Sequence, residues 1–199
     1  MALMISSTLY RQDGHGELFG DQEPRFFIYW TSDRYQKTGC FNTLCPGFIS
    51  VNPRAALGTR FTRTSTPGGD QFFVRFLVAQ QKQDWWLYVN YKVVGFWPGR
   101  LFNHMKEKAE KVMWGGEVYS EHGIDFPPMG SGYHSKQGWE KACFIKNIGV
   151  VKDRNERSDA PLDTITFVDS KCYSVTDEGI DGDPSWRRYF YFGGPGGQC

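Results

Sequence analysis

The sequence has no long hydrophobic run and no excess of charge of either sign. Its 199 residues include 23 basic and 22 acidic side chains, which give a formal net charge of +1. This balance excludes the strong electrostatic attraction that draws proteins to nucleic acid or to an anionic membrane. No apolar stretch approaches the roughly 20 residues that span a bilayer. Disorder is excluded too, because 17% of the residues are aromatic and would leave a large apolar area in water.

The cysteines and histidines show no metal-binding spacing. There is no CxxC pair and the four histidines are scattered, so we expect no metal and no cofactor. Cys40 and Cys45 can close a tight loop, and Cys172 is the expected partner of the terminal Cys199. Disulfides are typical of an oxidising compartment. The apolar run 1–5 has no basic residue before it and therefore does not have the pattern of a signal peptide.

Aromatic residues and turn formers together predict an all-β fold. The exception follows Pro98, where apolar residues at 101, 102, 105, 109 and 112 have helical spacing. We therefore predict an antiparallel β-sandwich with one short crossover helix over about 98–111. We expect an irregular segment over 1–17 and one domain over 18–199. The strand-like runs are 26–30, 47–51, 60–64, 71–78, 84–91, 93–97, 112–119, 143–151, 164–168 and 188–192.

Two motifs could carry chemistry. Glu117 follows Trp114-Gly115-Gly116, and consecutive glycines let the backbone bend or be approached closely. We expect the carboxylate to be partly desolvated by the neighbouring aromatic residues, as an acid–base catalyst would be; the alternative is a glutamate that simply faces water. The run 129–134 resembles a serine nucleophile elbow, but its first position is Met129, so a glycine-rich loop is the preferred interpretation.

The motifs, taken in order, resemble the neprosin family of plant proteins from about Leu18 to Cys199. They read YWTSD, GCFNTLCPGF, WWLYV, VGFWPGRLF, WGGEV, MGSG and FYFGGPGGQC. The resemblance implies a secreted glutamic endopeptidase that cleaves next to proline and is made with a signal peptide and an inhibitory pro-segment. It also implies the disulfide pairs Cys40–Cys45 and Cys172–Cys199, with Cys143 free.

The resemblance further implies two catalytic glutamates that face each other across the groove of an antiparallel β-sandwich. Glu117 corresponds to one of them, and Trp114, Gly115 and Gly116 are the expected substrate-binding residues. In such a pair the ionised carboxylate activates water, while the protonated one polarises the peptide carbonyl. The other glutamate is expected near Leu9, yet residues 1–12 contain no carboxylate. We therefore expect the C-terminal part of a neprosin domain, incomplete on its N-terminal side, with impaired peptidase activity.

Two other classes of function compete with a peptidase. One is a non-catalytic β-sandwich that binds a peptide or a cell-wall glycan through an aromatic groove formed by Trp85, Trp86, Trp97 and Trp114. The other is a glycoside hydrolase, which needs a second acid at roughly 5–9.5 Å from Glu117. For the peptidase we expect a monomer with a peptide or protein substrate and with no nucleic-acid or membrane partner. The cysteines and the resemblance indicate secretion, whereas the N-terminal sequence does not.

Overall fold

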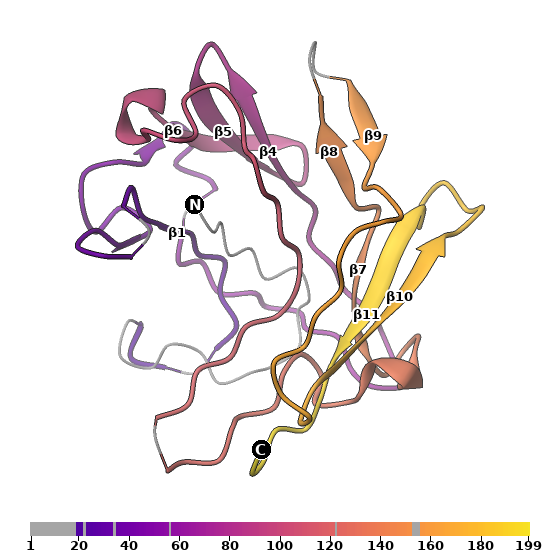
Figure 1. Cartoon of the computed structure of the whole chain (residues 1–199). Coiled ribbons are helices and arrows are strands. Elements are labelled where there is room, and N and C mark those ends of the chain that lie inside the picture. Colours follow the sequence, from indigo (N-terminus) through magenta and orange to yellow (C-terminus); the bar gives the residue numbers. More distant parts are fainter. Residues whose placement is uncertain (1–18, 22, 34, 56, 122, 153–155) are drawn as a thin grey trace. The chain divides into compact units, whose positions relative to one another are not determined.

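The computed structural model describes residues 19–199 except 22, 34, 56, 122 and 153–155 (Figure 1). The irregular segment predicted over 1–17, and the position near Leu9, lie outside these residues. The described chain divides into two compact units. Unit 1 contains Arg25–Phe61 and Val74–Trp114, and unit 2 contains Thr62–Phe73 and Gly115–Cys199, together with the described residues before Arg25.

Unit 1 contains a four-stranded antiparallel sheet of order β3-β6-β5-β4 and the strand pair β1-β2. Two-residue turns at 82–83 and 90–91 join β4 to β5 and β5 to β6, and all four turn residues have positive φ. This is the turn geometry that matches the twist of paired strands. The predicted strand-like runs 84–91 and 93–97 thus form a hairpin around Asn90. The strands are β1 Tyr29–Trp30, β2 Cys40–Phe41, β3 Ile49–Ser50, β4 Phe76–Gln81, β5 Asp84–Val89 and β6 Lys92–Trp97.

The core of unit 1 lies on one face of its sheet. Leu87, Val94 and Trp97 are completely buried together with Ile28, and the edge of the Phe48 ring packs on Trp97 at a centroid distance of 4.7 Å. Burying side chains of this size contributes roughly 1.5–3 kcal/mol each.

The helix predicted over about 98–111 is not formed. The segment contains one short 3₁₀ turn, η1 Gly99–Leu101, and no regular element after it. Trp85 donates its indole N–H to the carbonyl of Met105, and the Gln80 amide donates to the carbonyl of Lys106. These sheet side chains occupy carbonyls that a helix would need for its own hydrogen bonds. The apolar spacing reflects packing of the segment on the core of unit 1.

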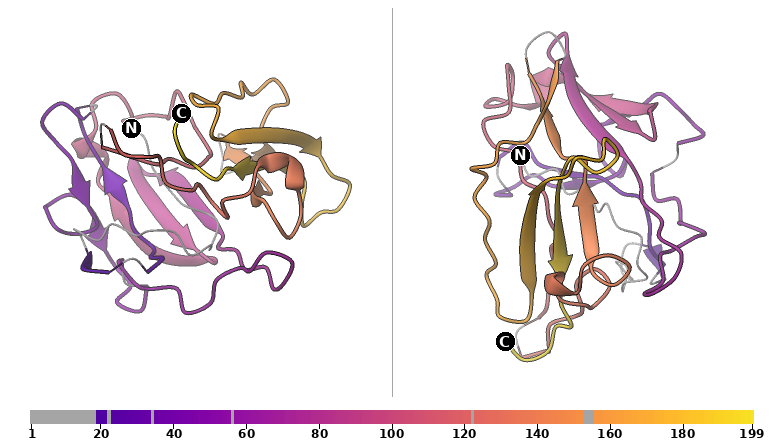
Figure 2. Two further views of the ribbon diagram at one scale, coloured as in Figure 1. Left: turned by 90° about the horizontal axis from the view of Figure 1, so that it is seen from below. Right: turned by 90° about the vertical axis from the view of Figure 1, so that its right-hand side faces the viewer.

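Unit 2 contains a three-stranded antiparallel sheet of order β10-β11-β7 and the hairpin β8-β9. The three strands of the sheet lie side by side in the right-hand view of Figure 2. The buried Arg188 of β11 forms an ion pair with Asp177 of β10, and this guanidinium holds the pKa of Asp177 below its usual value. The elements are η2 Ser135–Gln137, β7 Cys143–Lys146, β8 Gly149–Val151, β9 Arg157–Asp159, β10 Ser174–Ile180 and β11 Arg188–Gly193.

The antiparallel all-β fold is thus confirmed, whereas several predicted strands are not. The segments 112–119 and 164–168 form no strand, and 60–64 contributes only the bridge between Arg60 and Arg25. The sequence pattern missed β2, β9 and β10, which are short or rich in polar residues. Among the described residues, no helix is long and apolar enough to cross a membrane.

Candidate active site

Glu117 lies in a stretch of irregular backbone in unit 2. The residues 115–117 are exposed, so the partial desolvation expected for this carboxylate is not found. The division between the two units falls directly before Gly115, which leaves Trp114, a half-buried residue, in unit 1. Glu117 is therefore exposed to solvent.

The two glycines before Glu117 have different surroundings. A methyl group added at Gly115 would meet nothing within 4 Å. At Gly116 it would lie 2.7 Å from the sulfur of Met129 and 2.7 Å from Cε2 of Phe192, which is closer than van der Waals contact allows. Only the second glycine is in close contact with its surroundings, so a methyl group there would force the Met129 or Phe192 side chain to shift. Close packing at Gly116 fixes the backbone from which the Glu117 side chain extends.

Phe192 is held in the sheet as part of β11, and Met129 is held by a backbone ladder between two segments that contain glycine. Met129 exchanges backbone hydrogen bonds with Gly194, at 2.9 and 3.3 Å, and Phe126 does the same with Gly197, at 3.0 and 2.9 Å. A side chain at Gly194 would strike the carbonyl oxygen of Cys172, 2.1 Å away. The glycines of the last segment therefore allow it to lie directly against its neighbours.

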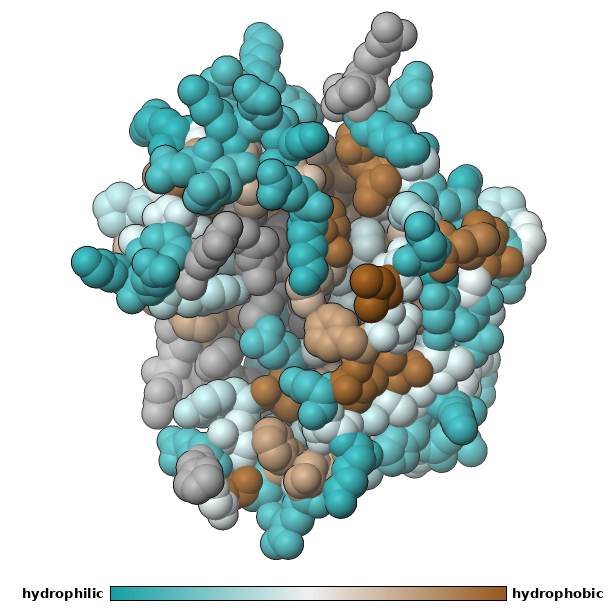
Figure 3. Space-filling model, in the orientation of Figure 1, coloured by the Kyte–Doolittle hydropathy of each residue, from teal (hydrophilic) through white to brown (hydrophobic). Residues whose placement is uncertain are grey.

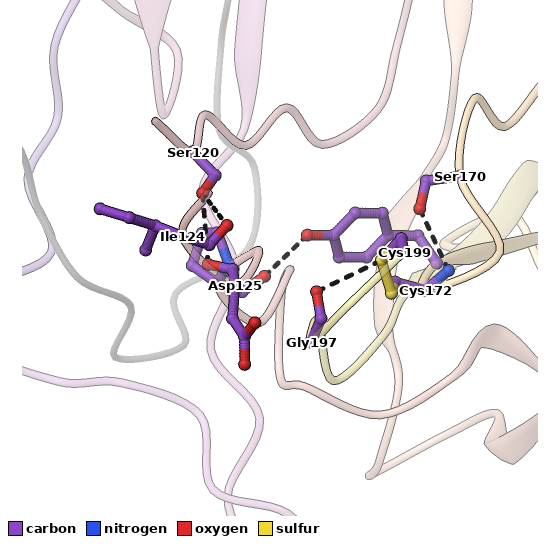
Figure 4. The surroundings of a disulfide bond; sticks show 9 residues. Ser120, Ile124, Asp125, Ser170, Cys172, Gly197 and Cys199 are labelled. Atoms are coloured by element: carbon purple, nitrogen blue, oxygen red, sulfur yellow. Dashed lines mark hydrogen bonds between the residues drawn. A yellow bond between two sulfur atoms is a disulfide. The ribbon is translucent and has the colours of Figure 1, made fainter. Parts of the chain in front are cut away.

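The Cys172–Cys199 disulfide closes this ladder (Figure 4). Beside it, the Tyr173 hydroxyl donates to the carbonyl of Pro127 at 2.8 Å, and burial raises the pKa of this phenol. The Ser120 hydroxyl, three residues after Glu117, donates to the carbonyl of Ile124 at 2.8 Å, within the loop that leads to the ladder. The Glu117 segment is thus supported at Gly116 and continues into a loop that is closed by its own hydrogen bonds.

Within the part of the chain that the structure describes, no hydrogen bond or ion pair joins Glu117 to another residue. No group of three metal-ligating side chains occurs among these residues either. A single, solvated carboxylate can accept a proton from water or hydrogen-bond a ligand. A paired mechanism would require a second carboxylate beside it.

The run 129–134 forms a glycine-rich loop, as preferred from the sequence. Gly130 has a left-handed φ of 69°, and a methyl group there would lie 2.5 Å from the sulfur of Cys143. His134 Nδ1 lies 3.2 Å from Ser174 Oγ, whereas the Ser131 hydroxyl accepts the backbone N–H of Tyr133. The histidine therefore does not pair with the serine that a nucleophile elbow would use.

The predicted aromatic groove does not form from all four tryptophans. Trp85 and Trp97 belong to the buried core of unit 1, because their β5 and β6 positions direct both indoles to its apolar face. Trp86 is half-buried and stacks on Phe96, with ring centroids 4.6 Å apart. Only Trp86 and Trp114 retain substantial exposed surface among these residues.

The predicted cysteine pairing is confirmed in full. The disulfides are Cys40–Cys45 and Cys172–Cys199, and Cys143 is free and buried. Two disulfides are consistent with an extracellular protein. The sequence did not reveal the supporting roles of Met129 and Phe192, because nothing in a linear motif shows which side chains pack on a glycine.

Comparison with protein families agrees with the resemblance of the sequence motifs. A family model described as Neprosin matches residues 14–195. This match covers most of the chain, and it includes Glu117, the glycine-rich loop and the Met129–Gly194 pair of the C-terminal ladder. The chain therefore belongs to the neprosin family.

Proposed function

We propose that the chain is a neprosin-like peptide hydrolase domain in which Glu117 supplies one carboxylate of a glutamic peptidase. The proposal rests on the contrast, within the WGGE motif, between the closely packed Gly116 and the exposed Glu117. Gly116 is packed against Met129 and Phe192, while the Glu117 side chain stays exposed. A fixed backbone with a free carboxylate is what a group acting on bound substrate requires.

In the reaction, an ionised carboxylate takes a proton from water as the oxygen attacks the peptide carbonyl carbon. The tetrahedral intermediate then collapses, the C–N bond breaks, and the departing amine receives a proton. A second, protonated carboxylate would polarise the carbonyl. Because no described carboxylate is hydrogen-bonded to Glu117, we expect slow turnover of the isolated chain.

The test is cleavage of a proline-containing peptide by the purified chain at acid pH, followed by mass spectrometry over a long incubation. Glu117→Gln should reduce the rate by at least about 100-fold, the usual contribution of a general acid or base. Glu121→Gln is the matched control, because this exposed glutamate lies in the neighbouring loop and should leave the rate unchanged.

Equal rates in the two variants would contradict the role of Glu117. Binding of the peptide without any cleavage, unaffected by either substitution, would instead support a non-catalytic binding module. Both variants replace an exposed side chain with one of equal size, so each should fold like the parent protein.

A further inference from the structure

The segment 161–169 of unit 2 presents a strip of large apolar side chains to solvent. Ile165 is 87% exposed and Phe167 is 64% exposed. We define the apolar strip as Leu162, Ile165, Phe167 and Val168, all of which are exposed. Brown side chains gather near the middle of the face in Figure 3, where Figure 1 draws the trace of this segment. Apolar surface gathered in this way is characteristic of an interaction site.

The backbone of the strip is also available for interactions, because its N–H and C=O groups lack hydrogen-bond partners in the described part of the chain. Among the described residues, no backbone group from Ile165 to Asp169 forms a hydrogen bond to another residue. None of these residues has positive φ, and the sequence Thr-Ile-Thr-Phe-Val is rich in β-branched and aromatic residues, which favour strands. A segment with strand-forming residues and free backbone groups is a template for an added strand.

The charges at the two ends of the strip determine which strand fits. Residues 164–168 contain no turn or bend, and alternate residues of an extended chain share a side, so Ile165 and Phe167 lie on the same side. Asp163 lies in the turn before this stretch and Asp169 in the bend after it, so a carboxylate flanks each end. A second copy pairing antiparallel about Thr166 would place Ile165 opposite Phe167, but it would also bring Asp163 of each copy beside Asp169 of the other. Like charges directly opposite each other destabilise a strand pair. Pairing of two copies in the register that covers Ile165 and Phe167 is therefore disfavoured.

We propose that the apolar strip is a docking site for an extended peptide segment that adds as an antiparallel strand and carries a basic residue on each side of two alternating apolar residues. Its apolar side chains would cover Ile165 and Phe167. Its basic residues would lie opposite Asp163 and Asp169. This interaction does not depend on Glu117 or on catalysis.

The test is a binding titration of the full chain with the peptide Lys-Thr-Val-Thr-Ile-Thr-Lys. The same peptide with glutamate at both ends should bind at least tenfold more weakly, and a version with proline as its central residue should not bind, because proline removes a backbone donor. The double variant Asp163→Lys/Asp169→Lys should reverse the preference between the lysine and glutamate peptides. All substituted positions are exposed, so these changes should not disturb folding.

Two further measurements keep the proposal open to refutation. Ile165→Thr should weaken binding, whereas Ile124→Thr, at another exposed isoleucine, should not. Amide hydrogen exchange should slow in residues 164–168 when the lysine peptide is bound, which reports the new backbone pairing. Absence of binding, or a preference that the double variant does not reverse, would overturn the proposal. So would concentration-dependent dimerisation that Ile165→Thr abolishes, since the occupant would then be a second copy.

Discussion

The packing at Gly116 leads to a quantitative prediction that uses the adjacent glycine as its control. Replacing Gly116 with alanine places a methyl group 2.7 Å from the Met129 sulfur and 2.7 Å from the Phe192 ring. Overpacking of this kind costs about 1–3 kcal/mol. Gly115→Ala adds the same methyl group where nothing lies within 4 Å, so its effect on stability should stay within about 1 kcal/mol.

The assay is guanidinium unfolding of both variants, with the free energy of unfolding obtained by linear extrapolation. A double-mutant cycle with Met129→Ala tests the contact directly. Met129 supplies two of the three nearest atoms to the added methyl group, so the cost of Gly116→Ala should fall when Met129 is shortened. This difference would appear as a coupling free energy above about 0.5 kcal/mol.

Equal stability of the Gly115 and Gly116 variants would refute the reasoning. The cleavage assay adds a functional readout. If Gly116 fixes the backbone of Glu117, then Gly116→Ala should lower the peptidase rate more than Gly115→Ala does, because small displacements of a catalytic group reduce the rate strongly.

Two further predictions concern stability and titration. Hydrogen bonds, of which the one from the Thr38 hydroxyl is the largest cause, lower the pKa of Asp33 to about 2. Any stabilisation by the ionised carboxylate is therefore present above the pKa of the unfolded state and is lost as the pH falls through about 2. NMR titration of Thr38→Val should show a higher midpoint for Asp33, and an unchanged midpoint would contradict this cause. Replacing Cys172 and Cys199 with serine removes a cross-link with a sequence separation of 27. By the loop-entropy relation this should lower the free energy of unfolding by roughly 3.5 kcal/mol. Guanidinium unfolding measures the change, and a loss below about 1 kcal/mol would contradict the relation.

The features that could be predicted from sequence are those with a local cause. The hairpin around Asn90 follows from two strand-like runs with a short polar turn between them, and Cys40–Cys45 follows from proximity along the chain. The prediction of a helix over 98–111 is wrong because residues distant in sequence determine the structure of this segment. Its carbonyls are bound by Gln80 and Trp85, which are distant in sequence, and the apolar spacing alone cannot distinguish a helix from a segment that packs irregularly on a core.

The candidate site shows the same limit. The WGGE motif identified Glu117, but the sequence treats Gly115 and Gly116 as equivalent, whereas packing requires only one of them. In the sequence, Met129 is the residue that departs from the serine nucleophile motif. In the structure its side chain supports the glutamate segment, and its backbone pairs with Gly194.

The segments in which sequence and structure disagree share a physical property. Residues 112–119 and 164–168 were predicted as strands, yet neither has a strand partner among the described residues. Each of these segments contains one of the two most exposed large apolar side chains of the described residues, Tyr119 and Ile165. These segments have a local preference for strand, yet the tertiary fold leaves them unpaired. Conflicts of this kind between local preference and tertiary fold are expected at functional sites. Pairing with another strand would resolve the conflict at 164–168, because it would satisfy the backbone and cover the apolar side chains at once.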